Sequence, residues 1–308
     1  MRQVILVSSP AAGRGNRLDD ARRAMVRVGL EVQSELPVTE LPLLDEMMRG
    51  GNGIDRLVVA AGGDGTVGAV AGVLAHGRAV LGVIPLGTSN DFARSLGISM
   101  RIDRAVRLLV EGKVSTVDMG RLEVPDRPPA HFVHAATAGL NVSFARLATR
   151  ASLRHRLGRL TYVVAALAAF RDHRPFACRL LYAGRNETLH LTHLSVINAP
   201  VFGGFLGMRL RDSSPDDRLL DVLAVEELGP WRAVAAGIHQ LLGIRRPLKG
   251  VHAFHVPRLH VHTDEVLEVA LDGEIAGRLP AEFAVAAEAL RVITPLDFED
   301  VDALSSKE

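Results

Sequence analysis

Glycines, an acid and hydroxyl side chains recur in two short stretches of the first hundred residues. Residues 62–66 read Gly-Gly-Asp-Gly-Thr, and residues 85–94 read Pro-Leu-Gly-Thr-Ser-Asn-Asp-Phe-Ala-Arg. Glycines at a turn let backbone N–H groups approach phosphate oxygens, and a helix N-terminus adds partial positive charge. Asp64 would repel bare phosphate, so it indicates a magnesium ion on the phosphates or the group that is phosphorylated.

Each stretch follows an apolar run typical of a buried strand, at 56–61 and 79–84, and precedes a segment typical of a helix. Carboxyl ends of parallel strands meet at one edge of a sheet, where open α/β sheets bind ligands. Taken alone, Gly-Gly-Asp-Gly indicates an ordinary tight turn equally well. The second stretch favours a nucleotide-phosphate site, and the acid favours a kinase.

Strand and helix patterns alternate over residues 1–122, which predicts a Rossmann-like α/β domain with a parallel sheet. Beyond it strand patterns follow one another, which predicts a β-sandwich domain over 123–295. The tail, 296–308, either packs back on the first domain or frays. The expected elements are strands at 3–9, 31–38, 56–61, 79–84, 131–140, 176–184, 188–198, 219–226, 258–262, 266–272 and 283–293, and helices at 18–28, 41–48, 67–74, 103–111, 144–170 and 230–243.

Length and composition exclude several classes of protein. The 308 residues can hold two domains with proper cores, and a net charge of +1 gives no electrostatic case for nucleic acid. The single cysteine, Cys178, excludes an intrachain disulfide and lies in a strand pattern, so we expect a small core residue. No signal-peptide pattern is visible, and the apolar run 160–170 is too short to span a membrane, so we expect a cytoplasmic protein.

At this point the chain resembles a family. The two glycine stretches together are similar to the catalytic domain shared by diacylglycerol kinases, sphingosine kinases and bacterial soluble lipid kinases. The segments 202–204 (Phe-Gly-Gly) and 214–222 (Ser-Pro-Asp-Asp-Arg-Leu-Leu-Asp-Val) resemble its second-domain signature, and 271–274 (Leu-Asp-Gly-Glu) resembles its late catalytic motif. The resemblance spans nearly the whole chain. Gly-Gly-Asp-Gly-Thr alone would also suit NAD kinases or phosphofructokinases.

The resemblance implies an α/β nucleotide-binding domain plus a β-sandwich, with the active site in the interdomain cleft and ATP and Mg²⁺ as cofactors. It implies that ATP is held by the two glycine stretches, by the loop after the first strand, where serine replaces the family's asparagine, and by a threonine after the second strand. These residues are Ser9, Pro10, Ala11, Ala12, Gly13, Thr39, Gly62, Gly63, Asp64, Gly65, Thr66 and Thr88.

The resemblance also implies the catalytic residues. Glu274 would be the general base for the lipid hydroxyl, and Asp272 and Asp64 would belong to the catalytic magnesium network. Phosphoryl transfer needs mainly positioning and charge neutralisation, so a carboxylate has only to accept the hydroxyl proton late in the transfer. The alternative for Asp272 and Gly273 is a plain hairpin turn, since Asp-Gly is the strongest short hairpin signal.

A second, structural magnesium is implied near Ser214, Asp217 and Leu219, with the outer two acting through backbone carbonyls. Here the chain departs from the family, whose usual sequence at these positions is Asp-Asp-Gly. Arg218 replaces the glycine and adds a positive charge near the proposed cation.

Two weaker patterns leave alternatives open. Residues 146–159 are strongly basic and precede the apolar run 160–170, which suits either docking on anionic lipid or a solvated helix face beside a core helix. The histidines at 252, 255, 260 and 262 suit either zinc or, with no third ligand identifiable, a solvated sheet face.

We therefore expect an ATP- and Mg²⁺-dependent lipid kinase of phospholipid metabolism that phosphorylates the free hydroxyl of diacylglycerol or a related lipid. It would be cytoplasmic, would touch the inner membrane face transiently, and would bind no nucleic acid; a homodimer is left open. The rivals are a kinase of a soluble alcohol, as in NAD kinases, and a catalytically silent nucleotide- or lipid-binding regulator.

Overall fold

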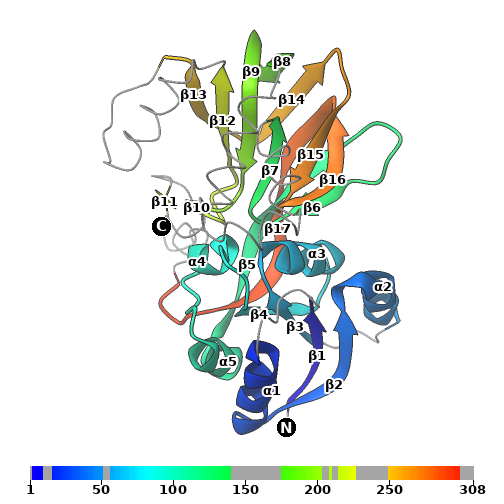
Figure 1. Ribbon diagram of the computed structural model, residues 1–308, viewed down its shortest axis with the longest axis vertical. Helices are drawn as coiled ribbons and strands as arrows, with labels where there is room; N and C mark the ends of the chain where they lie inside the picture. Colours follow the sequence, from blue (N-terminus) through cyan, green and yellow to red (C-terminus); the bar gives the residue numbers. More distant parts are fainter. Residues whose placement is uncertain are drawn as a thin grey trace, which may run out of the picture.

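The computed structural model describes residues 2–9, 16–50, 56–139, 175–202, 208–209, 214–226 and 249–298. Its first domain is built on parallel strands in the order β2-β1-β3-β4 (Figure 1), which are Leu30–Pro37, Arg2–Ser8, Leu57–Gly62 and Val80–Pro85. Every residue of β3 and β4 is buried, as expected for apolar runs covered on both faces. This confirms the predicted α/β domain.

Helices cover both faces of this sheet. α1 (Arg17–Arg27) and α5 (Ile102–Glu111) share one apolar core with the sheet, and α2 (Leu41–Arg49) and α3 (Asp64–Leu74) share the other. The short helices η1 (Val38–Glu40) and α4 (Asp91–Ser95) follow β2 and β4. The carboxyl ends of β3 and β4 therefore lead into α3 and α4, which places both glycine stretches at one edge of the sheet.

The second domain is antiparallel, which confirms the predicted all-β half. Its strands run in the order β16-β15-β7-β9-β8-β14-β17, with β12 paired to β9 and β13. Their bounds are β6 Ala130–Phe132, β7 Ala135–Gly139, β8 Phe176–Tyr182, β9 Arg185–Ile197, β12 Leu220–Glu226, β13 Val251–Val256, β14 Arg258–Thr263, β15 Leu267–Leu271, β16 Glu274–Leu279 and β17 Ala281–Thr294. A separate short pair joins β10 (Val201–Phe202) to β11 (Met208–Arg209).

Cys178 of β8 lies in the core of the second domain, where burial raises the pKa of its thiol to about 12. A thiol that stays protonated is a poor nucleophile, so the prediction of a core residue is confirmed.

Two long strands run through both domains (Figure 1). β17 pairs with β14 near its start and with β4 near its end, and β5 (Lys113–Glu123) pairs with it along both parts. Leu290 and Val292 consequently belong to a core of the first domain. Phe298 packs against that core as well, whereas residues 299–308 of the predicted tail lie outside the described part of the chain.

The structure differs from the predicted elements in several places. The strand predicted at 131–140 is divided into β6 and β7 by a turn at Val133 and His134. β5, β13 and β16 were not predicted as strands. Half of β16 is exposed, at the end of the sheet, so its residues do not alternate between buried and exposed. The helices predicted at 144–170 and 230–243 fall outside the described residues. Within the described residues, no helix has the length and apolar character needed to cross a bilayer.

Candidate functional site

The two glycine stretches touch each other. A Cβ atom built on Gly87 would lie 2.4 Å from the Cα of Gly63, so only glycine allows this backbone approach. The N–H of Leu86 also donates to the carbonyl of Gly62 over 2.9 Å. The turns that end β3 and β4 thus form one surface of main chain, of the kind that receives phosphate oxygens.

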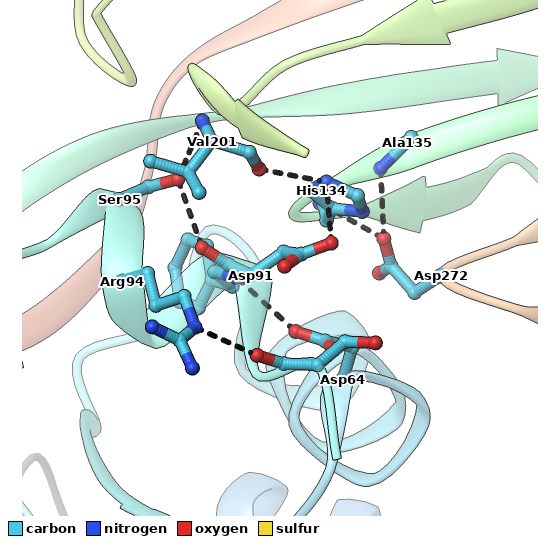
Figure 2. Close-up of polar contacts among 10 residues, drawn as sticks. Asp64, Asp91, Arg94, Ser95, His134, Ala135, Val201 and Asp272 are labelled. Atoms are coloured by element: carbon cyan, nitrogen blue, oxygen red, sulfur yellow. Dashed lines mark hydrogen bonds and ion pairs between the residues drawn. The ribbon is translucent and has the colours of Figure 1, made fainter. Parts of the chain in front are cut away.

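Asp64 opens α3 and also holds the second stretch. Its Oδ1 atom accepts a hydrogen bond from the N–H of Phe92 in α4 over 3.1 Å (Figure 2). Asn90 closes the loop before α4, donating to the carbonyl of Gly87 over 2.9 Å. Thr88 is exposed on this loop. The carboxylate of Asp64 is therefore fixed between the two glycine stretches.

Only some of the remaining residues predicted to bind the nucleotide lie in the described part of the chain. Thr39 is exposed in η1, which contacts α3. Ser9 is described at the end of β1, but Pro10, Ala11, Ala12 and Gly13 lie outside the described residues.

Asp272 and Gly273 do form a hairpin turn, between β15 and β16. Both have positive φ, +49° and +92°, and Leu271 pairs with Glu274 across them. The turn also docks on α3, because a Cβ built on Gly65 would lie 3.3 Å from Oε1 of Glu274. The hairpin and the catalytic interpretation are thus compatible, and the structure brings the early acid at 64 and the late pair at 272 and 274 to the same end of α3.

The carboxylate of Asp272 is buried and bound by three backbone N–H groups. These belong to Val133 (2.9 Å), His134 (2.8 Å) and Ala135 (3.1 Å). Burial raises the pKa of Asp272, while His134 and the three N–H donors oppose the rise. Asp272 therefore joins the β15–β16 turn firmly to the β6–β7 turn.

Gly68 leaves the space that Asp272 occupies. A Cβ on Gly68 would lie 2.2 Å from Oδ2 of Asp272, whereas a Cβ on Gly72, one turn later on α3, would meet no atom within 4 Å. We expect Gly68→Ala to displace the hairpin, destabilising the fold by about 1–3 kcal/mol. Gly72→Ala is the matched control and should stabilise by about 0.5–1 kcal/mol, since alanine favours helix. Urea unfolding of both variants measures this, and equal stabilities would contradict the docking.

A cavity of about 710 Å³ lies between the two domains beside these groups. First-domain residues of α2 and α3 line one side of it, including Pro42, Gly65 and Gly72. Residues of the second domain, including His131 and Glu274, line the other. The wall formed by α3 carries glycine and alanine at 65, 68, 69 and 72, so it is flat and mostly apolar.

His131 in the cavity wall is neutral at physiological pH. Burial, His76 and Arg121 together lower its pKa from 6.5 to about 4. Its Nε2 atom is buried and has no hydrogen-bond partner among the described residues. Protonation of this ring therefore opposes folding.

We expect the fold to lose about 3 kcal/mol of stability through His131 as the pH falls from 6.5 to 4, because the unfolded chain binds the proton more tightly in that window. His131→Phe replaces the imidazole with a ring that cannot be protonated, so it should remove this part of the loss of stability at low pH. Unfolding free energies at pH 7.5 and at pH 4 measure it; an unchanged pH dependence would contradict the burial of a neutral imidazole.

The loop predicted to hold a second magnesium has oxygen ligands and negative charge. Asp217 accepts backbone N–H bonds from Ser214 and Leu219, each over 2.9 Å. Burial raises the pKa of Asp217, and the like charges of Asp221 and Asp118 raise it further. Such a site suits a hard cation.

Arg218, which stands where the family has glycine, keeps the left-handed backbone at φ +59°. Its guanidinium pairs with Glu288 of β17 over 2.9 Å. Among the described residues no three His, Cys, Asp or Glu side chains are grouped to hold a metal ion. Both oxygens of Asp217 already accept backbone N–H groups, so the second magnesium site stays a prediction.

Sequence reasoning gave no role to two residues that the structure places in the site. Asp91 was part of the quoted motif and is buried at the start of α4. His134 gave no signal, because its position depends on the turn that divides β6 from β7.

Comparisons with known proteins agree with this fold. The diacylglycerol kinase catalytic domain matches residues 3–122, and the YegS C-terminal NAD kinase beta sandwich-like domain matches residues 134–294. The chain is 28% identical over 242 residues to a diacylglycerol kinase of Bacillus subtilis (78% of each chain). It is 30% identical over 240 residues to one of Mycobacterium tuberculosis (77% of this chain and 76% of that one). The fold is similar to that of a diacylglycerol kinase from Bacillus anthracis, with a TM-score of 0.68, 20% identity and coverage of 97% of this chain and 98% of that one.

Proposed function

Because the chain belongs to the diacylglycerol kinase catalytic domain family and carries a YegS-type C-terminal domain, we propose that it is a lipid kinase that transfers the γ-phosphoryl group of ATP to the free hydroxyl of diacylglycerol or a related lipid. The observation that carries this proposal is the meeting of Asp64, Asp272 and Glu274 around one end of α3, beside a cavity between the domains. Those are the groups that phosphoryl transfer to an alcohol requires.

We propose that the phosphates of ATP lie on the joined glycine turns, against N–H groups of residues 62–66 and beside Thr88. The adenosine would then lie in the cavity along the flat wall of α3, which starts at Gly65 and continues to Gly72. Ser9, Thr39 and the loop 10–13 complete the proposed nucleotide site. A flat apolar wall suits a planar base.

Gly72→Leu tests where the base lies. Nothing lies within 4 Å of a Cβ at this position, so the leucine variant should fold normally and its side chain should occupy part of the cavity. We expect KM for ATP to rise about tenfold, which corresponds to about 1.4 kcal/mol of binding, with little change in kcat. Gly72→Ala is the control, and an unchanged KM in both variants would exclude the base from this cavity.

We propose that Glu274 is the general base. It is exposed at the start of β16, next to Gly65, so it can accept a proton from an alcohol that approaches the γ-phosphate. Asp272 holds the turn that carries it. Asp64 would supply the carboxylate next to the phosphate surface, and Asp272, whose oxygens accept the N–H groups of residues 133–135, would add its negative charge to the magnesium network. Mg²⁺, when bound there, would neutralise the charge that builds up on the phosphates.

The other parts of the proposal concern the second cation and the membrane. Ser214, Asp217 and Leu219 would bind a structural Mg²⁺ that fixes the loop before β12. The protein would work in the cytoplasm and touch the inner membrane face only transiently, since its acceptor is a membrane lipid. The segment that we considered for docking, 146–170, lies outside the described residues.

Product analysis tests the function. Purified protein would be incubated with labelled ATP, Mg²⁺ and a total lipid extract, and then with a panel of soluble alcohols that includes NAD. We expect label in a chloroform-soluble product whose mass exceeds that of a lipid in the extract by one phosphoryl group (HPO₃). Label only in water-soluble product would refute the lipid assignment, and absence of any transfer would favour a silent regulator.

A further inference from the structure

His134 lies where the two domains meet, at the turn between β6 and β7. Its ring atom Nε2 is 3.0 Å from the carbonyl oxygen of Val201 and 3.8 Å from Oδ2 of Asp91 (Figure 2). A carbonyl only accepts hydrogen bonds, so Nε2 must carry the hydrogen. The ring therefore donates to β10 while it lies against an acid of α4.

Val201 is bound from both domains. Its N–H donates to the hydroxyl oxygen of Ser95 in α4 over 3.1 Å, and that hydroxyl donates to the carbonyl of Asp91 over 2.9 Å. Its carbonyl accepts from His134. The main chain of Val201 thus bridges α4 of the first domain to the β6–β7 turn of the second, and the hydrogen bond from His134 is one half of that bridge.

The same contacts lead to the acids on either side. On the first-domain side, Asp64 accepts from the N–H of Phe92, the residue after Asp91. On the second-domain side, the N–H of His134 donates to Asp272 over 2.8 Å, and Asp272 lies in the turn that ends at Glu274. His134 therefore stands in a continuous series of contacts that runs from Asp64 to Glu274.

We propose that His134 is a positioning residue for phosphoryl transfer: by joining α4 to the β6–β7 turn, it works with the docking of the β15–β16 turn on α3 to fix the separation between Asp64, at the phosphates, and Glu274, at the acceptor hydroxyl. This inference rests on the proposed function. Shifts of about 1 Å between reacting groups can lower turnover on the order of 10²-fold. Nucleotide binding should depend on His134 less than transfer does, because the joined glycine turns and the wall of α3, which make the proposed contacts with ATP, belong to the first domain.

The experiment compares His134→Leu with His134→Gln. Leucine fills the site without a donor, whereas the amide nitrogen of glutamine can replace Nε2 as donor to Val201. We expect leucine to lower kcat about 10- to 10²-fold with KM for ATP changed less than about twofold. Glutamine should recover kcat to within a few-fold of the wild type. His190→Leu, on the exposed part of β9, is the matched control and should change neither constant.

Hydrogen exchange supplies a readout that does not need catalysis. Amides of residues 91–97 and 198–202 should exchange faster in His134→Leu and at wild-type rates in His134→Gln. Unchanged kcat in the leucine variant, or a glutamine variant as slow as the leucine one, would overturn the proposal. If the wild type transfers no phosphate to lipid, the proposed function fails, yet the exchange rates still decide whether His134 holds the two domains together.

Discussion

Glu274→Gln should lower the turnover of lipid phosphorylation by at least about 10²-fold, with KM for ATP nearly unchanged. Glutamine has the size of glutamate but cannot accept the hydroxyl proton at neutral pH, so only the transfer step is affected. The side chain is exposed at the start of β16, and a glutamine of the same size keeps its contact with Gly65, so the variant should fold like the wild type. Steady-state kinetics with diacylglycerol in mixed micelles measure the change.

Glu265→Gln is the control for this variant. Glu265 is also exposed and precedes β15, at the far end of the hairpin from Glu274. Removing its charge should leave turnover within the error of the assay. If Glu274→Gln retained most of the wild-type turnover, another group would have to take the proton, and the role proposed for Glu274 would be wrong.

The parts of the site that the sequence predicted best are those set by local chemistry. The turns at 62–66 and 85–94 contain glycines that let two backbone segments approach each other closely. Each turn lies between an apolar strand and a helix. The alternation of strands and helices predicted the parallel sheet for the same reason. The family resemblance was needed for Asp272 and Glu274, because Asp-Gly taken locally indicates only a hairpin, which the structure also contains.

The parts that were missed depend on contacts between distant segments. Residues 131–140 contain no turn signal before Gly139, yet the strand is divided there because Asp272 binds three successive N–H groups. No pattern within residues 131–140 indicates a partner 138 residues away along the chain. β17 likewise joins both domains, because it pairs with β4 in the first and with β14 in the second. Alternation of apolar and polar residues predicts a strand there but does not indicate which strands it pairs with. The position of His134 depends on the bonds from residues 133–135 to Asp272, so no pattern near it in the sequence predicts it.

Asp64→Asn should lower turnover at least as much as Glu274→Gln, by about 10²-fold or more, but for a different reason. Asparagine keeps an oxygen that can accept the N–H of Phe92, so the joint between α3 and α4 should survive. What disappears is the negative charge beside the phosphate surface. We therefore expect the Mg²⁺ concentration needed for half-maximal activity to rise, which Glu274→Gln should not cause.

The contrast between the two variants assigns the two carboxylates. Titrating Mg²⁺ at saturating ATP measures it, with Asp103→Asn as control, since Asp103 is an exposed acid in the first turn of α5 that is away from the cavity. A Mg²⁺ dependence that stays at the wild-type value in Asp64→Asn would mean that its charge does not act on the cation. A rise in both variants would mean that Asp64 and Glu274 share one task, because the turn that carries Glu274 rests on the helix that Asp64 begins.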